Sequence, residues 1–434
     1  MVASALILYV GNFIDKYAVN ILYWDQWDYL TLMFTDGSRW QALWDLFLYQ
    51  HGPHRMGVGS VVILVLAELT GWNTRADAFA VFAFIIAAMV SGVILKRVLF
   101  RRWHWSDFVI PMIFLGLEQY EVFIAVPNES LASIPIFLVI FLCLCWNIPS
   151  RGLRTALILV INAMLTFTGF GILASPIIIG LLVWEAFQNY RNRDTAFRGS
   201  ALAAGVAILS TAAFFIQYHF DPAVSCFSLS ARNIVRTPLF MGLFYSRYFG
   251  LAYVAPTAIF ALVAGLFLLL VIAAVFINHL VRLLKSNPAT PALDRVIVIL
   301  LGYSLIFGLS AALGRVCLGL PASQAGRYVP FTFPAFLGLY LHVLSIPRVK
   351  PARWILILFV AAQFFTLHPA GYYNAAIQLY SVQKQNWKSC YLTYENIQQC
   401  NDLTGFKIYP DLTVEQEEKL DYLKTHHLNL YRGR

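Results

Sequence analysis

Long runs of apolar residues, separated by short polar connections, make up most of this chain. A helical crossing of a bilayer takes about 20 residues, and many of the runs approach that length. Because backbone groups inside lipid must be hydrogen-bonded within their own segment, the runs predict helices. We expect an all-α polytopic membrane protein with about 11 spans, at residues 1–14, 76–95, 108–124, 131–147, 155–168, 172–188, 199–217, 251–277, 296–313, 329–346 and 354–369.

Basic residues alternate with these runs in a way that predicts the orientation of the chain. Short cytoplasmic loops collect Lys and Arg, and such residues gather here in every second connection. They are Lys96, Arg97, Arg101, Arg102, Arg151, Arg154, Arg191, Arg193, Arg198, Arg282, Lys285, Arg295, Arg348, Lys350 and Arg353. We therefore expect a membrane protein whose amino terminus is cytoplasmic and whose carboxyl terminus is extracytoplasmic.

One further apolar run, residues 56–71, does not fit this alternation. If it crossed the bilayer, residues 96–102 would lie on the outer face, against the charge rule. We expect it to lie in or dip into the outer leaflet without spanning.

The composition agrees with a lipid environment. The chain is 59% hydrophobic and only 12% charged, and charged groups in such a protein are costly and tend to mark function. The formal net charge of +9 is mostly explained by the basic loops. We therefore expect the lipid bilayer as a partner, and no nucleic acid.

The outer face carries the longer connections, so function is expected there. In the first outer loop, residues 23–75, a capping-box pattern at 38–41 precedes an apolar stripe. This stripe predicts a short interfacial helix that lies flat on the membrane, and it consists of Trp40, Leu43, Trp44, Phe47 and Leu48.

We divide the chain into a transmembrane domain, 1–370, and a small extracytoplasmic tail, 371–434.

Two carboxylates open the first outer loop, in the stretch Asp25-Gln26-Trp27-Asp28. On a helix, residues at this spacing share a face. They are either a solvated loop edge beside interfacial tryptophans or a catalytic pair. A carboxylate near a low-dielectric boundary has a raised proton affinity, as a general base requires, and we favour the catalytic interpretation.

A second polar cluster follows in Gln50-His51-Gly52-Pro53-His54-Arg55. We expect Arg55 to bind an anionic group, with His51 and His54 adding hydrogen bonds. Two imidazoles and two aspartates could also form a zinc site. No His-Glu-x-x-His run supports that interpretation, so we expect no metal and no cofactor, with a divalent ion as the less favoured alternative.

Glu118 and Glu121 lie where one predicted span ends and the next begins. Placing carboxylates at the end of a span costs free energy, and these two either pair with arginines or bind sugar hydroxyls.

Later in the chain, Arg315, Arg327 and Tyr328 lie in another outer connection. Guanidinium groups form bidentate pairs with phosphate and are weakly hydrated, so they suit a phosphate at a lipid surface; structural pairing with acidic residues is the alternative.

Two cysteines, Cys390 and Cys400, lie ten residues apart in the tail. An oxidising compartment would allow a disulfide between them. Spacing alone does not establish proximity, so two free thiols remain the alternative.

Taken together, these motifs resemble those of the GT-C-type integral membrane glycosyltransferases, which use lipid-phosphate-linked sugars. The resemblance rests on Asp25-Gln26-Trp27-Asp28, the 50–55 cluster, the Glu118–Glu121 turn, Gly314-Arg315 and Arg327-Tyr328. It covers most of residues 1–370 and not the tail. It implies a polyprenyl-phosphate-linked sugar as donor, a glycan or glycolipid hydroxyl as acceptor, and Asp25 as the base with Asp28 second. It also implies a location in the bacterial cytoplasmic membrane.

Two other functions compete with sugar transfer. A transporter or flippase for a lipid-linked glycan would place polar groups near the membrane midplane, whereas ionisable residues here gather at one surface. A non-catalytic subunit that only holds glycolipid is the second alternative. Tight binding without turnover would favour it.

Overall fold

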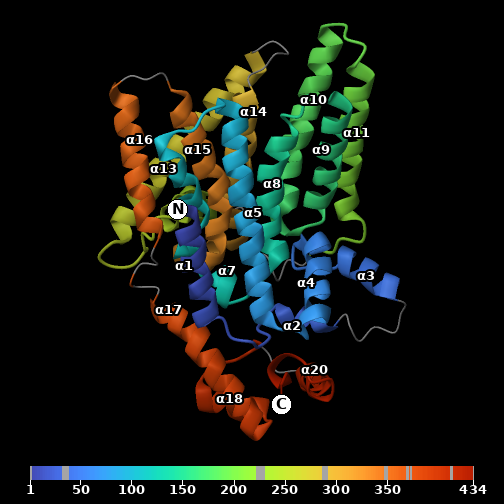
Figure 1. The fold of residues 1–434 in the computed structure, drawn as a ribbon, viewed down its shortest axis with the longest axis vertical. Helices are drawn as coiled ribbons and strands as arrows, with labels where there is room; N and C mark the ends of the chain where they lie inside the picture. The colour runs from blue at the N-terminus through green and yellow to red at the C-terminus, as the bar shows by residue number, and fades with distance from the viewer. Residues whose placement is uncertain are drawn as a thin grey trace.

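The computed structural model describes residues 2–31, 39–220, 230–285, 292–346, 350–367, 371, 374–410 and 414–433. Within these residues the regular secondary structure is helical apart from one hairpin, β1 (Gln50–His51) paired with β2 (His54–Arg55). Figure 1 shows a bundle of long, roughly parallel helices with smaller elements at its lower end. The predicted all-helical fold class is confirmed.

Among the described residues, 6 helices are long and apolar enough to cross a membrane. They are α5 (Thr74–Phe100), η5 with α10 (Gly169–Arg191), α11 with η6 (Phe197–Phe215), α13 (Ala258–Lys285), α14 with η7 (Ala292–Leu318) and η9 with α15 (Gly326–Ser345). These helices support a multi-pass membrane protein. The other predicted spans coincide with shorter helices, so the expected number of spans stays a prediction.

Several shorter elements complete the described chain. Four of them occupy predicted spans: α1 (Val2–Tyr17), α8 (Ile134–Cys145), α9 (Arg151–Thr166) and α16 (Lys350–Gln363). Further elements of the bundle are η2 (Trp105–Phe108), η4 (Glu129–Ser133), α12 (Ala231–Arg247), η8 (Leu320–Gln324) and η10 (Phe364–Thr366).

One predicted span, 108–124, is not a continuous helix. It divides into α6 (Val109–Phe114), η3 (Leu117–Gln119) and α7 (Glu121–Ile124). The break lies at Gly116, where an added Cβ would be 2.6 Å from the carbonyl oxygen of Thr366. The Gln119 side chain donates hydrogen bonds to the carbonyls of Phe114 (2.7 Å) and Gly116 (3.1 Å). An interruption inside a buried segment requires such replacement bonds.

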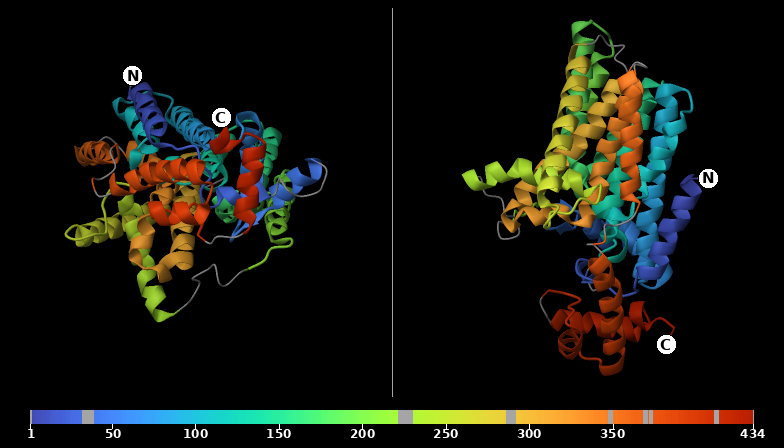
Figure 2. Two further views of the ribbon diagram at one scale, coloured as in Figure 1. Left: turned by 90° about the horizontal axis from the view of Figure 1, so that it is seen from below. Right: turned by 90° about the vertical axis from the view of Figure 1, so that its left-hand side faces the viewer.

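The two ends of the bundle carry different features. In Figure 1, α5, α10 and α13 end at the upper end, and each has basic residues in its last turn, Arg97, Arg191 and Arg282 with Lys285. The tail and α2 (Gln26–Thr31) lie at the lower end (Figures 1 and 2), and the hairpin lies beside α2, since His51 contacts Asp28. Basic connections and the first loop are therefore separated along the bundle.

Two short helices of the first loop differ in their surroundings. The predicted helix near 38–48 is present as α3 (Arg39–Leu48) and projects sideways from the bundle in Figure 1. Its Trp40 is 81% exposed and its Trp44 57% exposed. Such rings suit a membrane interface. Residues 56–71 form α4 (Gly57–Thr70), whose 14 residues are fewer than the roughly 20 that a span requires.

The tail is not packed as a separate body. It contains α17 (Asn374–Gln378), η12 (Leu379–Gln383), α18 (Lys384–Tyr394), α19 (Ile397–Thr404), α20 (Val414–Thr425) and η13 (Asn429–Tyr431). Its Trp387 and Leu420 share one hydrophobic core with Trp27 and Met56 of the first loop, distinct from the core of the bundle. The tail and the first loop therefore order each other.

Two contacts stabilise the tail. Cys390 and Cys400 form a disulfide between α18 and α19, with Cα atoms 5.7 Å apart, which decides between the two alternatives left open above. The buried Lys384 donates hydrogen bonds to the carbonyls of Ile124 (2.9 Å) and Ala125 at the end of α7. This lysine joins the tail directly to the bundle.

Candidate functional site

A cavity of about 590 Å³ lies between the first loop, α7 and α14. Pockets of this size are typical of small-molecule sites. Among the predicted site residues, those that line it are Asp25, His51, His54, Arg315, Arg327 and Tyr328. Asp25 is thus brought to the same cavity as two arginines that lie about 300 residues later in the chain.

The backbone around Asp25 is held tightly. Trp24 has a φ of 50°, a left-handed conformation that is uncommon outside glycine, and its N–H donates to the Ile408 carbonyl (2.9 Å). The buried Gln26 side chain accepts from the Tyr23 N–H (3.2 Å) and donates to the Pro127 carbonyl (3.3 Å). These bonds turn the chain at the start of α2, so that Asp25 lines the cavity.

The hairpin places the two histidines. Gly52 has a φ of 55°, which allows the tight turn between β1 and β2, and His51 is the cross-strand partner of His54. The Gln50 side chain accepts from the His219 N–H (3.0 Å) and donates to the His219 carbonyl (2.6 Å). The hairpin is therefore tied to the segment that follows η6.

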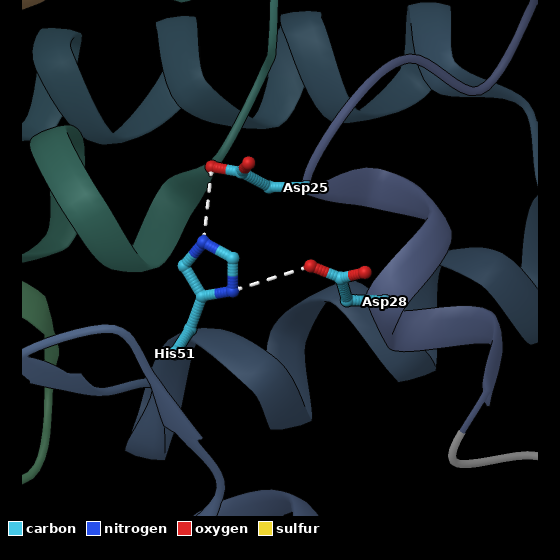
Figure 3. Close-up of side chains that lie close together, drawn as sticks. All are labelled: Asp25, Asp28 and His51. Carbon is cyan, nitrogen blue, oxygen red and sulfur yellow. Dashed lines mark ion pairs between the residues drawn. The ribbon is translucent and has the colours of Figure 1, made fainter. Parts of the chain in front are cut away.

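His51 lies between the two aspartates of the first loop (Figure 3). Its Nε2 is 3.3 Å from an Asp25 Oδ2, and its Nδ1 is 3.3 Å from an Asp28 Oδ2. The two carboxylates therefore contact opposite sides of one imidazole ring. Asp28 does not line the cavity, but it contacts His51, which does.

The charges of this cluster depend on one another. Burial on its own lowers the pKa of His51, but hydrogen bonds and charges from Asp25 and Asp28 outweigh it and raise the pKa to about 10. Burial raises the pKa of Asp25, yet its hydrogen bond to His51 and the charges of His51 and Arg327 leave that pKa below its ordinary value. The expected increase in the proton affinity of Asp25 is therefore wrong, because cationic neighbours dominate over the low dielectric.

His54 behaves in the opposite way. Burial, together with the charges of His51 and Arg315, lowers the pKa of His54 to about 3. Its ring lies 4.0 Å from the ring of Phe170, centroid to centroid. A neutral imidazole offers one hydrogen-bond donor and one acceptor, so His54 suits a hydroxyl group better than a phosphate.

The two arginines of the cavity differ in how they are paired. Within the described part of the chain, no hydrogen bond or ion pair engages the guanidinium of Arg315, which lines the cavity. Arg327 lies 4.0 Å from a Glu121 oxygen and above the ring of Tyr328 at 5.6 Å. Glu121 also accepts from the Gly326 N–H (2.8 Å). Arg315 is therefore the cation most available to an anionic ligand.

Glu118 and Arg55 lie outside the cavity wall. Glu118 is fully buried in an ion pair with Arg247, which also donates to the Glu118 carbonyl (3.0 Å). Arg55 donates to the carbonyls of Phe214 (3.1 Å) and Leu48. Arg55 therefore has a structural role in place of the expected contact with an anionic group, and Glu118 follows the alternative of pairing with an arginine. For Glu121 the ion pair with Arg327 likewise favours the structural alternative.

A divalent ion could be held by Asp25, Asp28 and His51, since one ligand atom from each lies within 4.8 Å of the others. Two carboxylates and an imidazole are an acceptable ligand set for zinc or manganese. Such an ion would have to replace the proton that the aspartates stabilise on His51. It would supply Lewis-acid polarisation of a bound oxygen.

Several residues of the site were not predicted from the sequence. Asn128 and Tyr218 line the cavity, and Asn128 donates to the Tyr29 hydroxyl (3.0 Å). Tyr409 of the tail donates a hydrogen bond to Asp28 Oδ1 (3.1 Å) although it lies 381 residues away. No local motif marks these residues, because their roles arise only from packing.

No family model, curated protein or solved structure matches this chain. Its chemistry is therefore inferred from the geometry and charge of the cavity.

Proposed function

We propose that this protein transfers a sugar from a polyprenyl-phosphate donor to a hydroxyl acceptor at the membrane surface that carries the tail. The observation that supports this proposal is the convergence of Asp25, Arg315 and Arg327 on one cavity. A carboxylate opposite guanidinium groups is the arrangement that such a transfer requires, with a base for the acceptor and cations for the departing phosphate.

The reaction involves one substitution at the anomeric carbon of the sugar. The acceptor oxygen attacks that carbon while its proton passes to Asp25. The bond between the carbon and the phosphate oxygen breaks, and its electron pair leaves with the lipid phosphate. Because the pKa of Asp25 lies below its ordinary value, the carboxylate is ionised and ready to accept the proton as the acceptor becomes acidic in the transition state.

The charges of the cavity suit an anionic donor. Protonated His51, Arg315 and Arg327 provide three positive groups along its wall, and Asp25 provides a negative one. Fixed positive groups stabilise a departing phosphate without needing to reorganise. His54, held neutral, would contact sugar hydroxyls.

The apolar part of the cavity suits the lipid portion of the donor. Ile306, Leu309 and Leu313 of α14 line it, the Leu309 side chain is 43% exposed, and α14 is one of the helices apolar enough to cross a membrane. An isoprenoid chain could therefore remain in contact with lipid while its phosphate reaches Arg315. The same reaction on a GT-C-like framework would need neither nucleotide nor ATP.

The site is proposed to face the extracytoplasmic side of a bacterial cytoplasmic membrane. The tail contains a disulfide, which persists in oxidising compartments. Basic residues end the helices at the opposite end of the bundle, as cytoplasmic loops do.

Asp25→Asn provides the direct test of the proposed base. Purified protein in nanodiscs would be incubated with a panel of radiolabelled polyprenyl-phosphate sugars and membrane extract as the source of acceptor. We expect the variant to lose transfer by about 100-fold or more. Asp45→Asn, on the exposed face of α3, is the matched control and should transfer normally. Full activity in Asp25→Asn would refute the assigned role.

Arg315→Gln tests the phosphate site in the same assay. We expect kcat/KM for the donor to fall by about 10- to 100-fold, the loss of a hydrogen bond to a charged group. Arg232→Gln, exposed on α12, serves as control. Donor binding by wild type without any transfer, together with movement of the lipid between leaflets, would favour the flippase instead.

A further inference from the structure

The tail reaches the cavity through a continuous series of side-chain contacts. The Tyr409 hydroxyl donates to Asp28 Oδ1 (3.1 Å), Asp28 Oδ2 lies 3.3 Å from His51 Nδ1, and His51 Nε2 lies 3.3 Å from Asp25 Oδ2. Tyr409 and His51 therefore contact different oxygens of the Asp28 carboxylate. Asp28 is therefore oriented by Tyr409 on one oxygen and by His51 on the other.

The segment that carries Tyr409 is itself fixed against the first loop. The Ile408 carbonyl accepts the Trp24 N–H (2.9 Å), and the ring of Phe406 stacks on the ring of Tyr23 at 5.3 Å. Ile408 and Phe406 are both buried. Tyr409 is thus held at a defined position beside Asp28, so its hydroxyl can act as a fixed donor.

We propose that Tyr409 is a positioning residue for Asp25, acting through Asp28 and His51. The Asp28 side chain is 20% exposed. Without the Tyr409 hydroxyl, one of its oxygens would therefore hydrogen-bond to water instead. The contact between Asp28 and His51 would then weaken, and His51 would no longer keep Asp25 in a single orientation. Small displacements of a reacting group reduce rates substantially.

The tyrosine is suited to this role over a wide pH range. Burial, followed by the charge of Asp28 and the hydrogen bond to it, raises the pKa of Tyr409 to about 12. The hydroxyl therefore stays protonated and remains a donor. The alternative is that Tyr409 only stabilises the tail, in which case its removal would affect folding without affecting the aspartate–histidine cluster.

The test compares Tyr409→Phe, Asp28→Asn and the double variant, with Tyr394→Phe as the control. Tyr394 lies at the end of α18 and is 54% exposed. The kinetic measurement rests on the proposed function, so a second measurement is made without substrate. It is the ¹⁵N spectrum of histidine-labelled protein in nanodiscs at one fixed pH. The signal of His51 among the 9 histidines is identified by its loss in His51→Gln.

We expect Tyr409→Phe to displace the His51 signal and to lower kcat by about 3- to 10-fold, the equivalent of one hydrogen bond, with the KM for the donor unchanged. Adding Tyr409→Phe to Asp28→Asn should have no further effect on either measurement, because the tyrosine acts through Asp28. Tyr394→Phe should resemble wild type.

The positioning role is overturned if Tyr409→Phe leaves the His51 signal in place, or if its effect adds fully to that of Asp28→Asn. A lower melting temperature with an unmoved His51 signal would also overturn it, since that result shows stabilisation alone. If wild type transfers no sugar from any donor while the His51 signal still responds as expected, the proposed function fails and the positioning role stands.

Discussion

At the scale of single residues, two side chains of the same type differ in their protonation state. His51 and His54 are cross-strand partners in one hairpin, yet the pKa of His51 is raised to about 10 and that of His54 is lowered to about 3. The difference arises because two carboxylates contact His51, whereas His54 is half-buried near the cations His51 and Arg315. The sequence marked both residues as candidates, but their different protonation states depend on neighbours from other parts of the chain.

The raised pKa of His51 predicts a pH-dependent contribution to stability. Since the pKa in the folded state is about 10 against an ordinary 6.5, the contribution is fully present below about pH 6.5 and is lost as the pH rises through about 10. The melting temperatures of wild type and His51→Gln should therefore differ most near pH 6 and converge above about pH 10.

His426→Gln, exposed on the tail, is the control for that measurement and should follow wild type throughout. A difference between wild type and His51→Gln that grows with pH would contradict the ion pairs inferred for His51.

At the scale of elements, periodic apolar runs predicted most helices, and the exceptions have identifiable causes. The run at 108–124 is broken because Gly116 packs against the backbone of Thr366 and Gln119 bonds the freed carbonyls. Thr366 lies far outside this run, so the run itself could not reveal the contact. The tail was predicted as a separate region, but it shares a core with the first loop.

Lys384 tests how far the tail depends on the bundle. Lys384→Met keeps most of the buried volume but removes the donor to the Ile124 and Ala125 carbonyls. Leaving buried carbonyls unpaired should lower the free energy of unfolding by about 1–3 kcal/mol, measured by thermal unfolding in detergent. Lys407→Met, at an exposed position of the tail, should cause no comparable change. Equal stability of the two variants would show that Lys384 does not anchor the tail.

At the scale of the whole molecule, the proposed chemistry depends on which face of the membrane the cavity meets. Figure 1 places the tail and the end of α10 at opposite ends of the bundle. If basic residues mark the cytoplasm, the cavity and the tail meet the other compartment, where a disulfide persists. The exposed tryptophans of α3 would then lie at the outer interface.

Cysteine labelling in intact cells tests this orientation. Gln398→Cys on the tail should react with a membrane-impermeant maleimide, whereas Arg193→Cys, just after α10, should react only after lysis. Both positions are exposed. The opposite pattern would place the cavity in the cytoplasm and exclude the proposed location of the reaction.

The sequence alone determined that this is a helical membrane protein, because the length and hydrophobicity of each apolar run decide whether it suits a lipid environment. It also showed that the polar and charged side chains lie mainly between those runs. It also indicated Asp25, His51, Arg315 and Arg327 as separate candidates. Only the tertiary structure decided that these four line one cavity, while Glu118 and Arg55 are used in internal contacts. The link from Tyr409 to Asp28 spans 381 residues, and contacts at such separation arise from packing rather than from any local pattern.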